Sequence, residues 1–143
     1  MGNNEIRTNL SEKIISLGGS VPSLIHPMSI ISRFANISPI GVYILPFTFI
    51  QADACVGKNT IILSHVNISH TTMIGNSCFI AGGAIIGAYT IIEDYVFIGQ
   101  GALSISGKVS CIGKHSYIGA RALLTQKVKP NDIVAGIPGK SIK

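Results

Sequence analysis

The chain has 143 residues and a net charge of +5, with 47% hydrophobic and only 12% charged residues. This length predicts one domain with a substantial core, and the low charged fraction favours a homo-oligomer over a monomer that must cover its whole surface with polar groups. No apolar run approaches the 18 or more residues of a membrane span, and the polar start does not resemble a signal peptide, so we expect no membrane association.

The N-terminal segment, residues 1–20, differs from the rest of the chain and predicts a short helix. Ile6, Leu10 and Ile14 recur at helical spacing, and a pair of glycines ends the run. We therefore separate this segment from the remaining region, 21–143.

In the second region aliphatic residues recur every sixth position, and between Ile50 and Ile98 the period holds without a slip. Four residues after each of these anchors stands a small or β-branched residue. A helix needs apolar positions at spacings of three and four, and an ordinary strand alternates by two, so neither accounts for this repeat. The period predicts an all-β fold, a parallel β-helix of triangular cross-section in which each hexad forms one short strand and one corner.

Because three hexads close one coil, residues 18 apart stack on neighbouring coils at roughly the 4.8 Å strand spacing. The outward residues Phe79, Phe97 and Tyr117 then form a ladder, which is either buried in a subunit interface or an apolar wall for a slender cofactor arm. We expect several glycines that directly follow anchors to lie at tight corners that favour a residue without Cβ. These are Gly57, Gly75, Gly87 and Gly99.

The C-terminal end departs from the regular repeat. The next clear anchor after Ile98 comes 14 residues on instead of 12, which predicts a small loop within Leu103–Val109. The tail Lys127–Lys143 is expected to cover the open end of the last coil, which otherwise exposes unpaired strand edges.

The last 36 residues carry seven basic side chains and one acid, Asp132. No basic helix or aromatic-rich motif accompanies this charge, so nucleic acid is disfavoured as a partner. A small polyanion bound near the C-terminal coils and a merely solvated basic end remain as explanations.

The three cysteines are odd in number and widely spaced, and Cys78 falls at an inward position. This usage favours a reduced, cytoplasmic protein over a disulfide-bonded one. An inward thiol is also a poor candidate for a nucleophile.

Two sets of residues resemble a known family. The tail segment 133–140, Ile-Val-Ala-Gly-Ile-Pro-Gly-Lys, resembles the closing motif of hexapeptide-repeat acyltransferases, with Gly139 where alanine is usual. Segments 2–7, 24–26 and 41–70 are similar to one branch, the nucleotide-sugar acetyltransferases of the sialic-acid and bacillosamine pathways. The resemblance implies a homotrimer of left-handed β-helices, with acetyl-CoA in a groove between adjacent subunits.

Complete members of this branch begin with a small Rossmann-like subdomain that holds the UDP of the acceptor. This chain starts at what resembles the end of that subdomain, so residues 1–20 are interpreted as its helical remnant. Gly2 and Asn3 are then what remains of the acceptor-nucleotide site. Residues 21–143 are interpreted as the acetyltransferase domain with a C-terminal cap.

In the family pattern a histidine followed by Glu or Asp, shortly before an Ile-Gly pair, supplies the general base. His70 matches this base, whereas Thr71 stands in the place of the carboxylate. An imidazole can take the proton of an attacking amine or hydroxyl at neutral pH, so direct transfer needs no acyl-enzyme. Asp53, 18 residues before Thr71, is predicted to orient His70 directly or through Thr71, although a plain surface aspartate is the alternative.

By the same correspondence, contacts with acetyl-CoA would fall at Phe79, Gln100 and Ala120. The phosphates of the cofactor would lie near Arg121 and the basic C-terminal end. The implied activity is acetylation of a nucleotide-linked amino sugar, with N-acetylation of a 4-amino sugar favoured and no bound metal.

Two rival interpretations stay open. His65 and His70 are five residues apart, a spacing that also resembles gamma-class carbonic anhydrases, whose zinc bridges two subunits. Such a site needs a third histidine from an earlier coil, and the candidate, His26, lies more than two coils before His70. The other rival is an inactive scaffold left by truncation.

Overall fold

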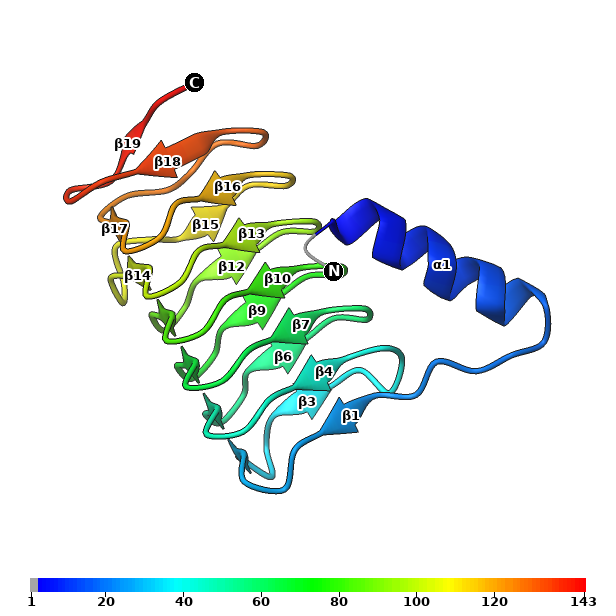
Figure 1. Cartoon of the computed structure of the whole chain (residues 1–143). Helices are drawn as coiled ribbons and strands as arrows, with labels where there is room; N and C mark the ends of the chain where they lie inside the picture. The colour runs from blue at the N-terminus through cyan, green and yellow to red at the C-terminus, as the bar shows by residue number, and fades with distance from the viewer. Residues whose placement is uncertain (1–2) are drawn as a thin grey trace.

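The computed structural model describes residues 3–143, which form one helix followed by a series of very short strands (Figure 1). The helix α1 spans Asn4–Ser16. The strands are β1 (Leu24–Ile25), β2 (Ile30–Ile31), β3 (Asn36–Ile37), β4 (Tyr43–Ile44), β5 (Phe49–Ile50), β6 (Cys55–Val56), β7 (Ile61–Ile62), β8 (Asn67–Ile68), β9 (Met73–Ile74), β10 (Phe79–Ile80), β11 (Ile85–Ile86), β12 (Ile91–Ile92), β13 (Phe97–Ile98), β14 (Leu103–Ser104), β15 (Cys111–Ile112), β16 (Tyr117–Ile118), β17 (Leu123–Leu124), β18 (Ile133–Ala135) and β19 (Lys140–Ser141).

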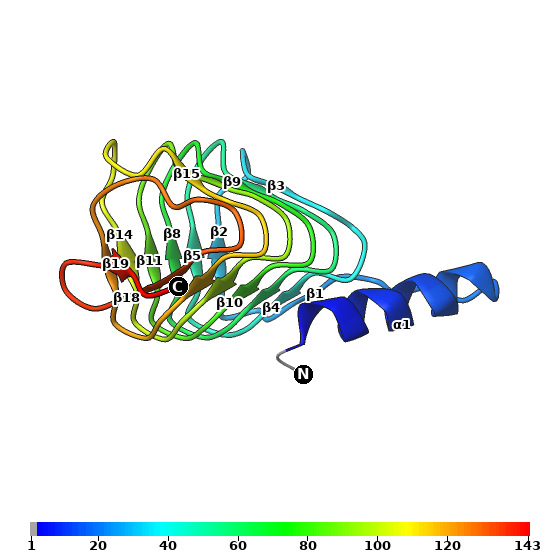
Figure 2. The ribbon, with the colours of Figure 1, turned by 90° about the horizontal axis from the view of Figure 1, so that it is seen from above.

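These strands build a three-sided solenoid of about six turns. The first face has the order β1-β4-β7-β10-β13-β16-β18-β19, the second β2-β5-β8-β11-β14-β17, and the third β3-β6-β9-β12-β15. Figure 2 looks along the coils and shows the three sides, with α1 projecting from one edge. The predicted left-handed parallel β-helix with a short N-terminal helix is confirmed.

The core is a continuous stack of the anchor residues. Most anchors from Ile44 to Ile118 are at most 1% exposed, and Val56 and Ile74 are 3% and 4% exposed. The anchors at 1% or less are Ile44, Ile50, Ile62, Ile68, Ile80, Ile86, Ile92, Ile98, Ile112 and Ile118. The strand register pairs Ile62 with Ile80 and follows the predicted step of 18. Full burial of one such side chain contributes roughly 1.5–3 kcal/mol, so the column supplies most of the driving force for coiling.

Three corners join the faces. The helix corner (57–60, 75–78, 93–96 and 113–116) joins the third face to the first. The Gln100 corner (45–48, 63–66, 81–84, 99–102 and 119–122) joins the first face to the second. The His70 corner (51–54, 69–72, 87–90 and 105–110) joins the second face to the third.

The sequence predicted that the glycines that follow anchors are needed for tight corners, but the structure shows that they are needed where the next coil approaches closely. A Cβ on Gly99 would lie 2.6 Å from the backbone nitrogen of Ala120, and one on Gly87 would lie 2.5 Å from the carbonyl oxygen of Ser104. Their requirement is therefore close approach of the next coil. The left-handed backbone occurs one position before the following small residue, for example at Thr71, with φ of 58°.

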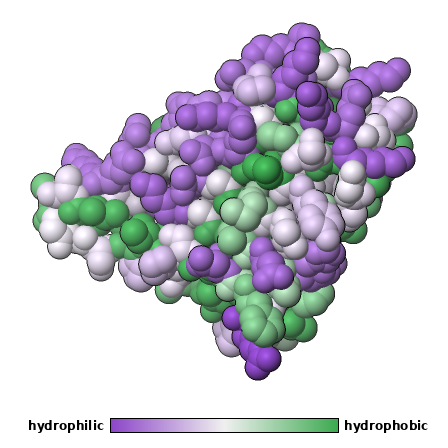
Figure 3. Space-filling view, turned by 180° about the vertical axis from the view of Figure 1, so that it is seen from behind, coloured by the Kyte–Doolittle hydropathy of each residue, from purple (hydrophilic) through white to green (hydrophobic). Residues whose placement is uncertain are grey.

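The helix packs on its corner through its polar face. Asn4, Thr8 and Ser11 are buried, whereas the apolar residues of predicted helical spacing face outward, with Leu10 56% exposed. Figure 3 shows apolar atoms along the arm that α1 forms. No helix within residues 3–143 has the length and apolarity needed to cross a membrane.

Hydrogen bonds to the solenoid hold this polar face. The Thr8 hydroxyl lies 2.6 Å from the Ser77 hydroxyl, and the Ser11 hydroxyl donates to Asn59 Oδ1 at 2.9 Å. The Arg7 guanidinium donates to the carbonyl oxygens of Asn59 and Cys78, and burial lowers its pKa. The helix is therefore fixed to the solenoid by polar complementarity rather than by an apolar stripe.

The C-terminal tail does more than cover an open end. Val128 forms a parallel bridge with Ile112, and β18 pairs in parallel with β16, so the tail continues the solenoid on two faces. Only then does β19 reverse and pair antiparallel with β18. The reason is burial, because Val128 and Val134 extend the core by one layer.

Candidate active site

His70 lies at the corner between β8 and β9, with its side chain exposed. Its backbone N–H donates to Gln51 Oε1 at 3.2 Å, which ties it to the preceding coil. Its imidazole Nδ1 lies 3.2 Å from the hydroxyl oxygen of Thr71. The residue in the family's carboxylate position therefore does contact the ring, but through a neutral hydroxyl.

A second contact comes from Tyr89, which the sequence analysis did not single out. The rings of His70 and Tyr89 have centroids 5.1 Å apart and planes at 89°, an edge-to-face arrangement. A signal for it was available, because Tyr89 follows Thr71 by the coil length of 18 residues.

Both rings border a shallow pocket of about 310 Å³. Its lining is Gln51, Ser69, His70, Ala88, Tyr89, Ser106 and Gly107. The predicted loop within 103–109 forms one side of this pocket, and Ser106 Oγ accepts a hydrogen bond from the Ala88 backbone at 3.0 Å. The loop that contains the two extra residues of the repeat therefore lies beside His70.

Asp53 stands one coil before Thr71, as predicted, with the same left-handed backbone at φ of 59°. Within residues 3–143, however, no hydrogen bond or ion pair joins the Asp53 carboxylate to Thr71 or to His70. Of the predicted link from Asp53 through Thr71 to His70, the contact between Thr71 and His70 is present. The orienting role of Asp53 remains a prediction.

The residues assigned to acetyl-CoA lie elsewhere. Gln100, Ala120 and Arg121 are at the Gln100 corner, where the Arg121 N–H donates to the Gln100 carbonyl at 2.8 Å. Gln100 also lines a second pocket, of about 530 Å³. The second face separates this corner from His70, so a single chain does not bring the base and these residues together.

Phe79 belongs to the aromatic ladder on the first face, and the predicted stacking is confirmed. The Phe79 and Phe97 rings are parallel within 1° with centroids 5.2 Å apart, and Phe97 and Tyr117 are parallel within 1° at 4.5 Å. Tyr117 is 47% exposed in the isolated chain. Both an interface and a cofactor wall therefore remain open for the ladder.

The two histidines of the zinc alternative are at different corners of one coil. His65 is at the Gln100 corner, where its ring contacts that of Phe47 at 5.1 Å. In the part of the chain that the structure describes, no three His, Cys, Asp or Glu side chains gather as a metal site. The chain by itself does not assemble the ligand set of a gamma-class carbonic anhydrase.

Cys78 points inward and is fully buried, as expected. Burial raises the pKa of its thiol to about 12, and its Sγ donates to the Glu93 carbonyl at 3.1 Å. A thiol that stays protonated cannot serve as the acyl acceptor.

Of the two residues assigned to the acceptor nucleotide, Gly2 lies outside the described residues. Asn3 caps α1, because its Oδ1 accepts the backbone N–H of Ile6 at 3.0 Å. A pocket of about 430 Å³ beside it also includes Tyr95 and His115.

The comparisons with solved structures decide the fold family. PerB from Caulobacter crescentus, in complex with CoA and GDP-perosamine, superposes with a TM-score of 0.95 and 24% identity over all of this chain and 68% of that one. The acetyltransferase domain of PglB from Neisseria gonorrhoeae FA1090, in complex with acetyl coenzyme A, gives 0.92 and 28% over 99% of this chain and 68% of that one. This chain has the hexapeptide-repeat β-helix fold of these acetyltransferase structures.

Other comparisons agree with this assignment. WeeI from Acinetobacter baumannii AYE gives a TM-score of 0.93 at 24% identity, over 99% of this chain and 68% of that one. An acyl-[acyl-carrier-protein]–UDP-N-acetylglucosamine O-acyltransferase from Mesorhizobium japonicum is 40% identical over 57 residues, which are 40% of this chain and 20% of that protein. No family model matches the chain. The chain spans about two thirds of the length of these structural neighbours.

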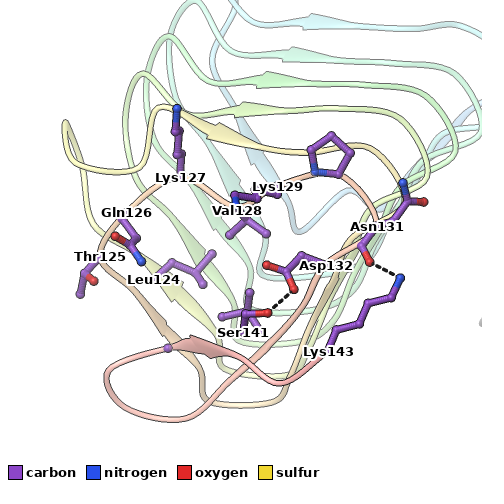
Figure 4. Close-up of a pocket in the computed structure, with 13 residues that line it drawn as sticks. Leu124, Thr125, Gln126, Lys127, Val128, Lys129, Asn131, Asp132, Ser141 and Lys143 are labelled. Atoms are coloured by element: carbon purple, nitrogen blue, oxygen red, sulfur yellow. Dashed lines mark hydrogen bonds between the residues drawn. The ribbon is translucent and has the colours of Figure 1, made fainter.

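The C-terminal end of this hexapeptide-repeat β-helix encloses a cavity of about 520 Å³ between the last coil and the β18–β19 hairpin (Figure 4). Lys127, Lys129 and Lys143 line it, and Lys143 Nζ donates to the Asn131 carbonyl at 2.8 Å. The acid Asp132 accepts from the Ser141 hydroxyl at 2.6 Å. The predicted basic end is therefore present.

Proposed function

We propose that the chain transfers the acetyl group of acetyl-CoA to the amine of a nucleotide-linked amino sugar, with His70 as the general base. The main support for this proposal is the His70 imidazole, which contacts Thr71 and borders a pocket. The solenoid that carries it is similar to the PglB domain that was crystallised with acetyl coenzyme A. PerB was crystallised with CoA and GDP-perosamine, an amino-sugar nucleotide. In two further structures of that enzyme one histidine is replaced, by alanine or by asparagine.

The proposed chemistry is a direct transfer. The sugar nitrogen attacks the thioester carbonyl carbon, and Nε2 of His70 takes the proton that the nitrogen loses. The C–N bond forms and the C–S bond breaks, and the CoA sulfur leaves with the proton that the imidazolium returns. Cys78 takes no part, because its thiol is buried and protonated.

The active site is proposed to be shared between subunits of a homotrimer. His70 and the Gln100 corner are on opposite sides of the second face, so a neighbouring protomer has to supply its Gln100 corner to the pocket beside His70. Exposed apolar side chains on the outer faces support such an assembly, since Phe49 and Ile85 on the second face and Ile91 on the third are 40–50% exposed. Gln100, Ala120 and Arg121 would then contact acetyl-CoA from that protomer.

The division into a helical remnant, 1–20, and an acetyltransferase domain, 21–143, is part of the same proposal. A nucleotide-linked amino sugar as the acceptor, and N- rather than O-acetylation, are proposed from the resemblance and from the neighbours' ligands. Asn3 is proposed as a residual contact with that nucleotide.

The test is a panel assay. Protein and acetyl-CoA are mixed with UDP-, GDP- and dTDP-linked 4-amino sugars, and release of the CoA thiol is followed. His70→Ala is expected to lower kcat by about 10²–10⁴ on any accepted sugar, the usual contribution of a general base. His115→Ala is the matched control, because His115 lies at the helix corner and contacts Tyr95.

Unchanged turnover in His70→Ala would refute the assignment of the base. Stoichiometric zinc in purified protein would favour the carbonic anhydrase alternative. Binding of acetyl-CoA without turnover on any sugar of the panel would favour an inactive scaffold.

A further inference from the structure

Four turn residues with a left-handed backbone follow one another up the His70 corner. They are Asp53, Thr71, Tyr89 and Gly107, with φ of 59°, 58°, 63° and 71°. Asn67 pairs with Ile85, so Tyr89 occupies on the next coil the place that Thr71 occupies beside His70. Gly107 has no side chain, and a Cβ built there would meet no atom within 4 Å.

The His70 ring depends on neutral contacts for its orientation. Among residues 3–143 it has no ion-pair partner, and its ring contacts are the Thr71 hydroxyl and the Tyr89 ring. An exposed imidazole on a single hydrogen bond can change rotamer, because water competes for the same nitrogen. An edge-to-face neighbour restricts this rotation, since such ring pairs favour one relative orientation.

We propose that Tyr89 is a positioning residue for His70. Its ring holds the imidazole so that Nδ1–H donates to the Thr71 hydroxyl and Nε2 is left as the nitrogen that takes the proton. This inference rests on the proposed function for its catalytic meaning, but the contact itself is independent of any substrate.

The contact is tested first on the free protein. Long-range ¹H–¹⁵N spectra of the histidine side chains are recorded for the wild type, Tyr89→Phe and Tyr89→Asn. Asparagine removes the ring but tolerates the left-handed backbone. We expect the Nδ1–H form of His70 in the wild type and in Tyr89→Phe, and a shift toward a mixture of tautomers in Tyr89→Asn. Unchanged His70 nitrogen shifts in Tyr89→Asn would overturn the proposal.

The matched control is Tyr95→Asn. Tyr95 has the same turn conformation, with φ of 61°, and its ring stacks on His115 at 4.8 Å on the helix corner. The Tyr95→Asn variant should change the nitrogen shifts of His115 and leave the nitrogen shifts of His70 unchanged. A change at His70 in this variant as large as that in Tyr89→Asn would show a general structural effect and contradict the proposal.

Kinetics then test the catalytic meaning on the sugar that the panel assay identifies. Tyr89→Asn is expected to lower kcat by about tenfold, the upper range for an aromatic pair, with the KM for acetyl-CoA unchanged and with Tyr89→Phe restoring kcat. Equal losses in the Phe and Asn variants would overturn the proposal, because the hydroxyl rather than the ring would then matter. If the wild type acetylates no sugar, the proposed function fails, whereas the nitrogen shifts still decide whether Tyr89 holds His70.

Discussion

The imidazole Nδ1 of His70 lies 3.2 Å from the hydroxyl oxygen of Thr71, so the candidate base is oriented by a neutral group. A carboxylate in that place would attract the imidazolium, whereas a hydroxyl only fixes the ring. This pair separates the chain from the family pattern and makes the base sensitive to changes at one side chain.

Replacing Thr71 tests this orientation. Thr71→Val keeps the side-chain shape but removes the hydrogen bond, and kcat is expected to fall by about 2- to 13-fold, which corresponds to the net 0.5–1.5 kcal/mol of a neutral hydrogen bond. Thr71→Asp places a carboxylate beside the ring that would attract the imidazolium, so the acidic limb of the kcat–pH profile should move to higher pH. Identical pH profiles for the wild type and Thr71→Asp would contradict the contact.

The shared active site predicts complementation between two defective variants. His70→Ala lacks the base and Arg121→Ala lacks a residue of the Gln100 corner, so each homo-oligomer should be weakly active. Mixed oligomers made by co-expression should regain part of the activity, because some sites combine an intact base with an intact corner from the neighbouring protomer. Mixing after separate assembly, without subunit exchange, serves as the control. A site within one chain would show no recovery.

The attachment of α1 predicts that polar rather than apolar changes lower stability. Thr8→Val leaves the buried Ser77 hydroxyl without its 2.6 Å partner and should cost about 1–3 kcal/mol. Leu10→Ser changes a side chain that is 56% exposed and should stay within about 0.5 kcal/mol. Urea unfolding of both variants measures the difference, and an equal loss in Leu10→Ser would mean that the outer face of α1 is covered in solution.

Two stacked glycines predict how closely the coils approach. Gly99→Ala places a Cβ 2.6 Å from the Ala120 nitrogen, so the backbone of the next coil has to move. Gly119→Ala, one coil later, meets its nearest atoms at 3.3 Å and is the matched control. We expect a loss above about 2 kcal/mol for the first and a smaller loss for the second, measured by thermal unfolding. Similar melting temperatures for the two variants would show that the coils are not so tightly stacked.

Cys78 predicts a dependence of stability on pH. Burial raises the pKa of its thiol to about 12 in the folded chain, from an ordinary value of 9.0. The folded state therefore holds a proton that the unfolded state loses, and the free energy of unfolding should fall as pH rises from about 9 toward 12. Cys78→Ala should show a smaller fall, because alanine fills the equivalent inward position at Ala84 and does not titrate.

The cysteines also differ in their predicted reactivity. Cys55 and Cys111 are partly exposed, so at pH 8 iodoacetamide should modify them in the folded protein, more slowly at Cys111, whose pKa is raised by burial and by Glu93. Cys78 should react only after unfolding. Its modification in the folded state at a comparable rate would show that the core opens at this layer.

Several features could be predicted from the sequence because the repeat encodes them. A step of 18 residues is a simple translation along the solenoid, so the inward column from Ile44 to Ile118, the ladder of Phe79 and Phe97 and the loop beside Ser106 follow from counting. The place of His70 at a corner follows in the same way. Even Tyr89 could have been found by adding one coil to Thr71.

The sequence by itself determined the solenoid, because burial of one aliphatic residue in every six leaves the backbone no other regular way to satisfy its hydrogen bonds. Only the tertiary structure decided which face of α1 packs inward and that the tail adds strands to the stack. It also decided that, among residues 3–143, no hydrogen bond joins Asp53 to His70. These features depend on contacts between side chains that are far apart in sequence, such as Thr8 and Ser77, and no periodicity encodes such contacts.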